Sequence, residues 1–109
     1  MTHTNIKGLP TDCEYVTLST GSDRQPYKVV RKTRCTMDIA QVYTCKHDAW
    51  SPSFQVGGFS AHCTNQSEQT WLYTGLATST LRVHKPRTGW EAHRTLTLNT
   101  AVRFYDYNF

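Results

Sequence analysis

The sequence has little of what most structural classes depend on. Charged residues make up 18% and hydrophobic residues 38% of its 109 positions, and both fractions are low for a globular protein. It contains no run of about 18 apolar residues, so no membrane-spanning segment is predicted. No window repeats apolar residues at the i, i+3, i+4 and i+7 spacing of an amphipathic helix. These absences disfavour the helical and membrane-spanning classes.

The usual signatures of catalysis and of export are absent too. There is no Gly-rich phosphate loop, no Gly-x-Ser-x-Gly elbow and no paired-carboxylate motif, so no cofactor is expected. The first ten residues, MTHTNIKGLP, lack the apolar segment of a secretory signal. Two interpretations stay open. The chain is either a mature secreted domain with an added Met1 or a protein made without a signal, such as a virion component.

The residues that are abundant favour β-strands. Threonine is frequent and aromatic residues reach 12%, a composition that suits pleated, half-exposed surfaces. The clearest alternation is RTLTLNTAVRFYDY, residues 94–107, which predicts one long strand, or two strands joined by a bend near Asn99 and Thr100. Its apolar face would carry Leu96, Leu98, Val102 and Phe104, and its opposite face would be solvent-exposed.

Six further segments alternate in the same way and are separated by turn signals. They span residues 14–20, 27–33, 37–45, 54–62, 70–76 and 80–85. About seven short strands at this spacing predict a single all-β domain over residues 1–109, an antiparallel β-sandwich or small barrel. Gly57 and Gly58 inside one segment predict a bulge or a sharp bend. The expected core comprises Val16, Leu18, Val29, Ile39, Val42, Phe54, Val56, Phe59, Leu72, Leu76, Leu81, Val83, Leu96, Leu98, Val102 and Phe104.

The four cysteines predict two disulfides. An even count in a small chain is typical of proteins from oxidising compartments, and Asn65 begins a glycosylation sequon. Both features point to an extracellular protein. The connectivity stays open, with a preference for pairing consecutive cysteines in the order Cys13, Cys35, Cys45 and Cys63.

A zinc site is the alternative use of two of these cysteines. Cys45 and His47 would share one face of a strand, whereas His62 and Cys63 are adjacent and would point to opposite faces. Four ligands would then fail to converge as tetrahedral zinc requires. We therefore predict structural cystines and no metal.

A ribonuclease-like reaction is a further alternative. It needs a general acid, a general base and a cation near the scissile phosphate. Glu91, His93 and Arg94 lie close together in the chain, and in a strand Glu91 and His93 would share a face. An ordinary exposed pair explains the same pattern, so we do not expect an enzyme.

Basic residues gather in two segments, KVVRKTR and LRVHKPR, within a net charge of +4. Lys28 and Lys32 would share a strand face, with Arg31 on the other. Trp and Tyr residues near turns would add exposed rings of the kind that stack on sugars or contact proteins. The predicted ligand-binding residues are Trp71, Tyr73, Trp90, Tyr105, Tyr107, Lys28, Lys32, Arg82, Lys85 and Arg87. Edge protection and solubility explain the charges equally well.

These observations predict a non-enzymatic, disulfide-stabilised binding module located outside the cell or in a virion. Its partner would be a glycan, a host surface or another protein, and an anionic ligand would suit the basic segments. The alternative is a structural subunit of an assembly, such as a virion coat or decoration protein that forms a homo-oligomer. That alternative explains a Thr-rich β chain without a signal peptide.

Overall fold

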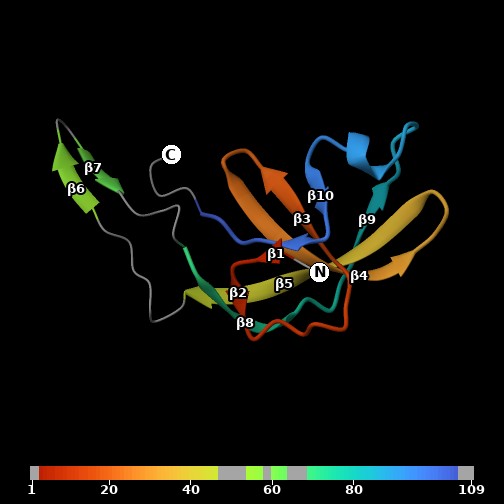
Figure 1. Cartoon of the computed structure of the whole chain (residues 1–109), viewed down its shortest axis with the longest axis horizontal. Coiled ribbons are helices and arrows are strands. Elements are labelled where there is room, and N and C mark those ends of the chain that lie inside the picture. The colour runs from red at the N-terminus through yellow and green to blue at the C-terminus, as the bar shows by residue number, and fades with distance from the viewer. Residues whose placement is uncertain (1–2, 47–53, 58–59, 64–68, 106–109) are drawn as a thin grey trace.

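The main body of the protein is an open, curled β-sheet that forms a half-barrel (Figure 1). The computed structural model describes residues 3–46, 54–57, 60–63 and 69–105, with the main chain only for 54–57, 60–63 and Glu91. The all-β class predicted from the sequence is confirmed, but the main sheet neither closes into a barrel nor packs on a second large sheet. No helix in the described ranges is long and apolar enough to cross a membrane.

The strands follow the sequence alternation closely. In chain order the elements are β1 (His3–Thr4), β2 (Ile6–Lys7), β3 (Tyr15–Thr20), β4 (Asp23–Lys32), β5 (Thr36–Lys46), β6 (Phe54–Gly57), β7 (Ser60–Cys63), β8 (Trp71–Leu76), β9 (Leu81–His84), the 3-10 helix η2 (Trp90–Ala92), β10 (Leu96–Leu98) and β11 (Thr100–Ala101). The short strands β1 and β2 and the helix η2 had no signal in the sequence.

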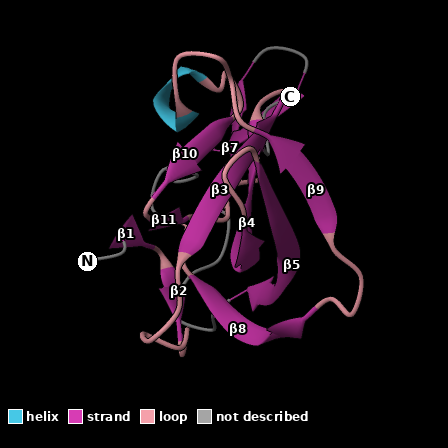
Figure 2. Cartoon of the chain, turned by 90° about the vertical axis from the view of Figure 1, so that its right-hand side faces the viewer, coloured by secondary structure: helices cyan, strands magenta, loops and turns pink. Residues whose placement is uncertain are grey.

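The long strand β5 organises the sheet. The strand order is β10-β3-β4-β5-β8-β2, and β9 pairs with the first part of β5 while β8 pairs with its second part. Figure 2 shows the sheet curling from β10 through β5 to β8 and β2. Bulges interrupt the β4–β5 and β5–β8 ladders, and bulges bend strands and increase their twist. They account for a curled sheet rather than a flat one.

Two smaller sheets complete the fold. β1 and β11 pair in parallel, so the start of the described chain lies beside residues 100–101. β6 and β7 form an antiparallel hairpin with Gly57 opposite Ser60. The chain therefore reverses after Gly57, which confirms the sharp bend predicted there and divides the predicted strand 54–62 in two.

Apolar clusters lie on both faces of the central sheet. Neighbouring residues of a strand point to opposite faces, and Tyr15 and Val16 of β3 are both buried but in different clusters. The first cluster contains Val16, Leu18, Met37, Ile39, Val83, Trp90 and Leu96. The second contains Ile6, Tyr15, Val42, Trp71 and Ala101. Both faces of β3 are therefore covered, and Thr17 is buried as well.

Most of the predicted core is confirmed. The buried members are Val16, Leu18, Ile39, Val42, Val83 and Leu96, and those packed half-buried against the clusters are Val29, Leu76 and Leu98. Leu72, Val102 and Phe104 are half-buried as well. Leu81 is wrong, because it is 46% exposed at the start of β9. The side chains of Phe54 and Val56, and residue Phe59, lie outside the described part.

The predicted disulfide between Cys13 and Cys35 is not formed, since both residues are free. β3 begins opposite Lys28, but β4 continues to Lys32 before the chain turns at Cys35. The β4–β5 turn thus extends beyond the start of β3, and Cys13 instead packs against the second cluster. Extended strands of unequal length keep these two sulfur atoms from meeting as the prediction required.

The other predicted bridge is not observed either. Cys45 is a free, exposed residue near the end of β5. The side chain of Cys63, its expected partner, lies outside the described part. The structure consequently lends no support to stabilisation by disulfides.

Candidate polyanion-binding surface

The two basic segments of the sequence are brought together across β5. Arg31 on β4 pairs with Asp38 on β5, which in turn pairs with Arg82 on β9. Beyond them, the backbone N–H of Lys85 donates to the carbonyl oxygen of Cys35 at 2.8 Å. Figure 1 shows the β4–β5 turn and the chain that follows β9 at the same end of the molecule. Segments about 50 positions apart thus lie together at one end of the sheet and present their side chains on the surface there, with Arg31 and Lys32 on opposite faces.

We call this surface the basic end and define it by six exposed cations. They are Arg31, Lys32, Arg34, Arg82, Lys85 and Arg87. Two carboxylates offset part of this charge: Lys32 Nζ lies 3.3 Å from Glu14, and Arg82 Nε lies 2.8 Å from Asp38. In the described part of the chain the other four cations have no ion-pair partner. Six cations and two carboxylates give the basic end a net charge of +4, which equals the net charge of the whole chain.

Asp38 connects the two sides of this surface. Its carboxylate accepts from Arg82 Nε at 2.8 Å and from Nη2 at 3.3 Å. The hydrogen bond and charge of Arg82, together with the charge of Arg31, hold the pKa of Asp38 below its usual value. The carboxylate therefore stays ionised at neutral pH and orients Arg82 without removing the excess of positive charge.

A β-bulge changes which basic side chains lie on the same face of the sheet. Residues paired on adjacent strands share a face. Lys28 pairs with Ala40, and Lys32 pairs with Met37, three positions away on β5. The bulge just before Arg31 therefore places Lys28 and Lys32 on opposite faces, and the shared face predicted for them is wrong. Lys28 is half-buried beside the sheet centre and lies outside the basic end.

The predicted aromatic platform is largely inside the protein. Trp71 is 8% exposed and Trp90 is 7% exposed, each within one of the apolar clusters. Tyr73 is half-buried against the second cluster, and only Tyr105 is exposed as expected, at 44%. Tyr107 lies outside the described residues. The tryptophans fill the core, which leaves little ring surface for sugar stacking.

The structure does not place Glu91 and His93 as the ribonuclease-like hypothesis requires. Residues Trp90–Ala92 form a 3-10 helix rather than a strand, so the shared strand face predicted for Glu91 and His93 is wrong. The ring of His93 stacks on Trp90 with centroids 6.5 Å apart, and its Nδ1 accepts from the backbone N–H of Thr95 at 3.4 Å. These contacts give His93 a local structural role.

Metal ligands do not converge in the described part of the protein. No group of three His, Cys, Asp or Glu side chains there is placed to hold an ion. Of the candidate zinc ligands, His47 and the side chains of His62 and Cys63 lie outside that part. The structure therefore adds nothing in favour of a zinc site.

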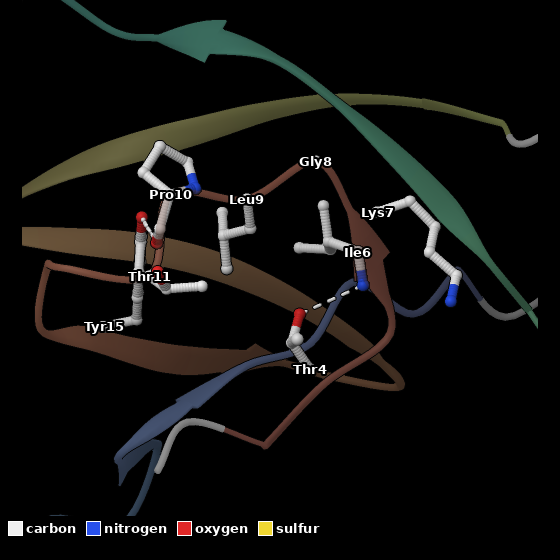
Figure 3. Close-up of a pocket in the computed structure, with 8 residues that line it drawn as sticks. All are labelled: Thr4, Ile6, Lys7, Gly8, Leu9, Pro10, Thr11 and Tyr15. Carbon is white, nitrogen blue, oxygen red and sulfur yellow. Dashed lines mark hydrogen bonds between the residues drawn. The ribbon is translucent and has the colours of Figure 1, made fainter.

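A cavity of about 380 Å³ lies beneath the N-terminal segment, between β2 and Tyr15 (Figure 3). Two of its hydroxyl groups are already engaged. The Tyr15 hydroxyl donates to the carbonyl of Pro10 at 2.7 Å, and the Thr4 hydroxyl donates to Ala101 at 2.6 Å. Burial, with a smaller effect of Cys13, raises the pKa of Tyr15 well above that of a free phenol. The cavity offers mainly apolar walls, and Lys7 is the charged residue among those that line it.

Comparison with models of protein families, with curated proteins and with solved structures found no match. Of the surfaces described, the basic end is the one on which several side chains of the same chemistry converge.

Proposed function

We propose that this protein is a non-enzymatic binding module, acting outside the cell or in a virion, whose ligand is a polyanion. The observation that supports this is the meeting of two distant basic segments across β5. Four of the six cations there have no carboxylate partner in the described part of the chain. Such a concentration of like charge repels itself and attracts oppositely charged ligands.

The composition of the basic end indicates what it would recognise. Residues 30–38 and 81–88 contain no Phe, Trp or Tyr, so His84 is the one aromatic ring that they offer for base stacking. Arginine and lysine side chains on extended strands would instead contact successive phosphate or sulfate groups. A nucleic acid backbone and a sulfated glycan share this chemistry, and the ligand would be bound by the spacing of its charges.

Two double variants, each of which replaces two basic residues with Glu, test the proposal. The double variant Arg34→Glu/Lys85→Glu alters the basic end, and Lys7→Glu/Lys46→Glu makes the same charge change at exposed sites on β2 and at the far end of β5. Binding of heparin and of a mixed-sequence RNA would be measured between about 50 and 200 mM salt. We expect the first variant to weaken binding at least about tenfold and to reduce the salt slope by about 2, as the loss of two contacts predicts.

The control variant should lose much less affinity. Equal losses for the two variants would mean that binding depends on net charge alone, and this would refute a site at the basic end. An absence of binding to both polyanions would refute the proposed function. Tighter binding of one polyanion at equal charge would identify the ligand class.

A structural subunit of an assembly is the second candidate. The observation that favours it is the open sheet, because among the described strands β9 pairs only with β5 and β10 only with β3. Unpaired strand edges are ready to accept a strand from another chain. Light scattering across a concentration series tests this function, which requires stable oligomers.

A further inference from the structure

The last described residues are held by side chains in place of a neighbouring strand. The amide of Asn5 binds both main-chain groups of Arg103: its Nδ2 donates to the carbonyl oxygen at 2.8 Å, and its Oδ1 accepts from the N–H at 3.0 Å. Asn5 Nδ2 also donates to the carbonyl oxygen of Gln69 at 3.1 Å. One side-chain amide therefore reproduces the pair of bonds that a strand neighbour would make.

Gln69 repeats this arrangement two residues further on. Its Nε2 donates to the carbonyl oxygen of Tyr105 at 2.6 Å, and its Oε1 accepts from the N–H of Tyr105 at 3.0 Å. The same Oε1 accepts from the indole N–H of Trp71 at 3.2 Å. Gln69 is 4% exposed, so its own amide has little access to water as an alternative partner.

The residue between them is bound from the opposite side. The main chains of Phe104 and Arg24 exchange two hydrogen bonds, of 2.9 and 3.0 Å. Cation-π contacts then set the register, with the Arg103 guanidinium 5.1 Å from the Trp71 ring and the Arg24 guanidinium 6.0 Å from the Phe104 ring. We call this site the peptide slot and define its walls as Asn5, Arg24, Gln69 and Trp71.

No wall of the peptide slot belongs to the segment that fills it. The chain reaches the slot through Asn99, which has a φ of 57° between β10 and β11. This left-handed residue is the bend that turns residues 100–105 back onto their own body. The sequence on both sides keeps one period-2 alternation, from Leu96 to Phe104, and is therefore equally compatible with a straight strand.

We propose that the peptide slot also accepts residues 103–105 from a second copy of this chain, so that two copies exchange their C-terminal segments. A second copy is the fitting occupant because its Arg-Phe-Tyr sequence makes the same side-chain contacts, and these contacts do not depend on which chain supplies it. An empty slot would deprive Gln69 Nε2, on a side chain that is 4% exposed, of the Tyr105 carbonyl oxygen to which it donates. When Asn99 straightens, an identical segment from a neighbour fills the slot.

The hinge provides a direct test with the full-length protein. Asn99 is exposed, so substitutions there leave the packing of the core intact. Val strongly disfavours the left-handed conformation, whereas Gly adopts it freely. We expect Asn99→Val to raise the ratio of dimer to monomer at least about tenfold over Asn99→Gly, as measured by size-exclusion chromatography with light scattering. Monomers for both variants at every concentration would overturn the proposal.

A complementation experiment guards against misfolding of the hinge variant. Gln69→Leu spoils the slot but keeps the segment, and Phe104→Pro removes the N–H that bonds to Arg24 but keeps the slot. Mixed together and refolded, the two full-length variants should form a heterodimer in which the Phe104→Pro slot holds the Gln69→Leu segment. Native mass spectrometry should show this heterodimer in excess over both homodimers. A mixture that behaves as the sum of its two components would overturn strand exchange.

Discussion

The amide of Gln69 holds the main chain of Tyr105 on both sides, accepting from its N–H at 3.0 Å and donating to its carbonyl oxygen at 2.6 Å. The two residues are 36 positions apart, and the Gln69 side chain is buried. With the indole of Trp71 as a third partner, Gln69 joins β8 to the C-terminal segment. This contact closes one side of the half-barrel without a regular strand.

Replacing Gln69 should therefore be costly. Gln69→Leu removes three hydrogen bonds and leaves the buried indole N–H of Trp71 unpaired, which should lower the free energy of unfolding by about 2–4 kcal/mol. Gln25→Leu is the control, since half-buried Gln25 makes one bond, from Nε2 to the carbonyl oxygen of Val42 at 3.0 Å. It should cost about 1 kcal/mol. Urea unfolding measures both, and equal losses would mean that the Gln69 network contributes no more than a single bond.

Adjacent residues of β10 point to opposite faces of the sheet, so replacing them should change stability by different amounts. Leu96 is buried in the first apolar cluster, whereas Thr97 is exposed on the opposite face. Leu96→Ala should cost about 2–5 kcal/mol through lost burial and the cavity that remains. Thr97→Ala should cost less than about 1 kcal/mol. Thermal and urea unfolding test the pair, and similar losses would contradict the facing or indicate that a partner covers Thr97.

Burial of Tyr15 predicts a loss of stability in alkali. Its folded-state pKa is raised above the value of about 10 for an exposed phenol. A raised pKa means that the neutral phenol contributes its full stability below about pH 10, and that this stability is lost as the pH rises further. Tyr15→Phe has no group to ionise, so its unfolding free energy should fall less steeply between about pH 9 and 11. Parallel slopes for the two proteins would contradict the prediction.

The free cysteines predict a difference in reactivity. Cys35 is exposed in the β4–β5 turn, whereas Cys13 is half-buried against the second cluster. Under native conditions iodoacetamide should modify Cys35 several-fold faster than Cys13, because alkylation needs an accessible thiolate. Peptide mass spectrometry over a time course measures both rates. A Cys13–Cys35 disulfide in the isolated protein would contradict the observed arrangement and support the pairing predicted from the sequence.

The positions of the strands were determined by the sequence itself. Alternation over residues 14–20, 37–45 and 70–76 predicted β3, β5 and β8 to within one residue at each end. Pleating places successive side chains on opposite sides, so a period of two is a local property that can be read without knowledge of the fold. The bend at Asn99 and the reversal after Gly57 were local too, because both depend on residue types that favour turns.

Only the tertiary structure decided what covers each face and which charges meet. Alternation marked residues 14–20 as a strand, but it did not show that Ile6 of β2 and the strand β11 would pack on one face of β3, where Tyr15 and Thr17 are buried. The sequence showed two basic segments, and their meeting at the basic end required β5 to pair with β4 and with β9. The peptide slot joins residues 36 to 98 positions apart. Such contacts depend on distance in space, which a pattern of neighbouring residues does not contain.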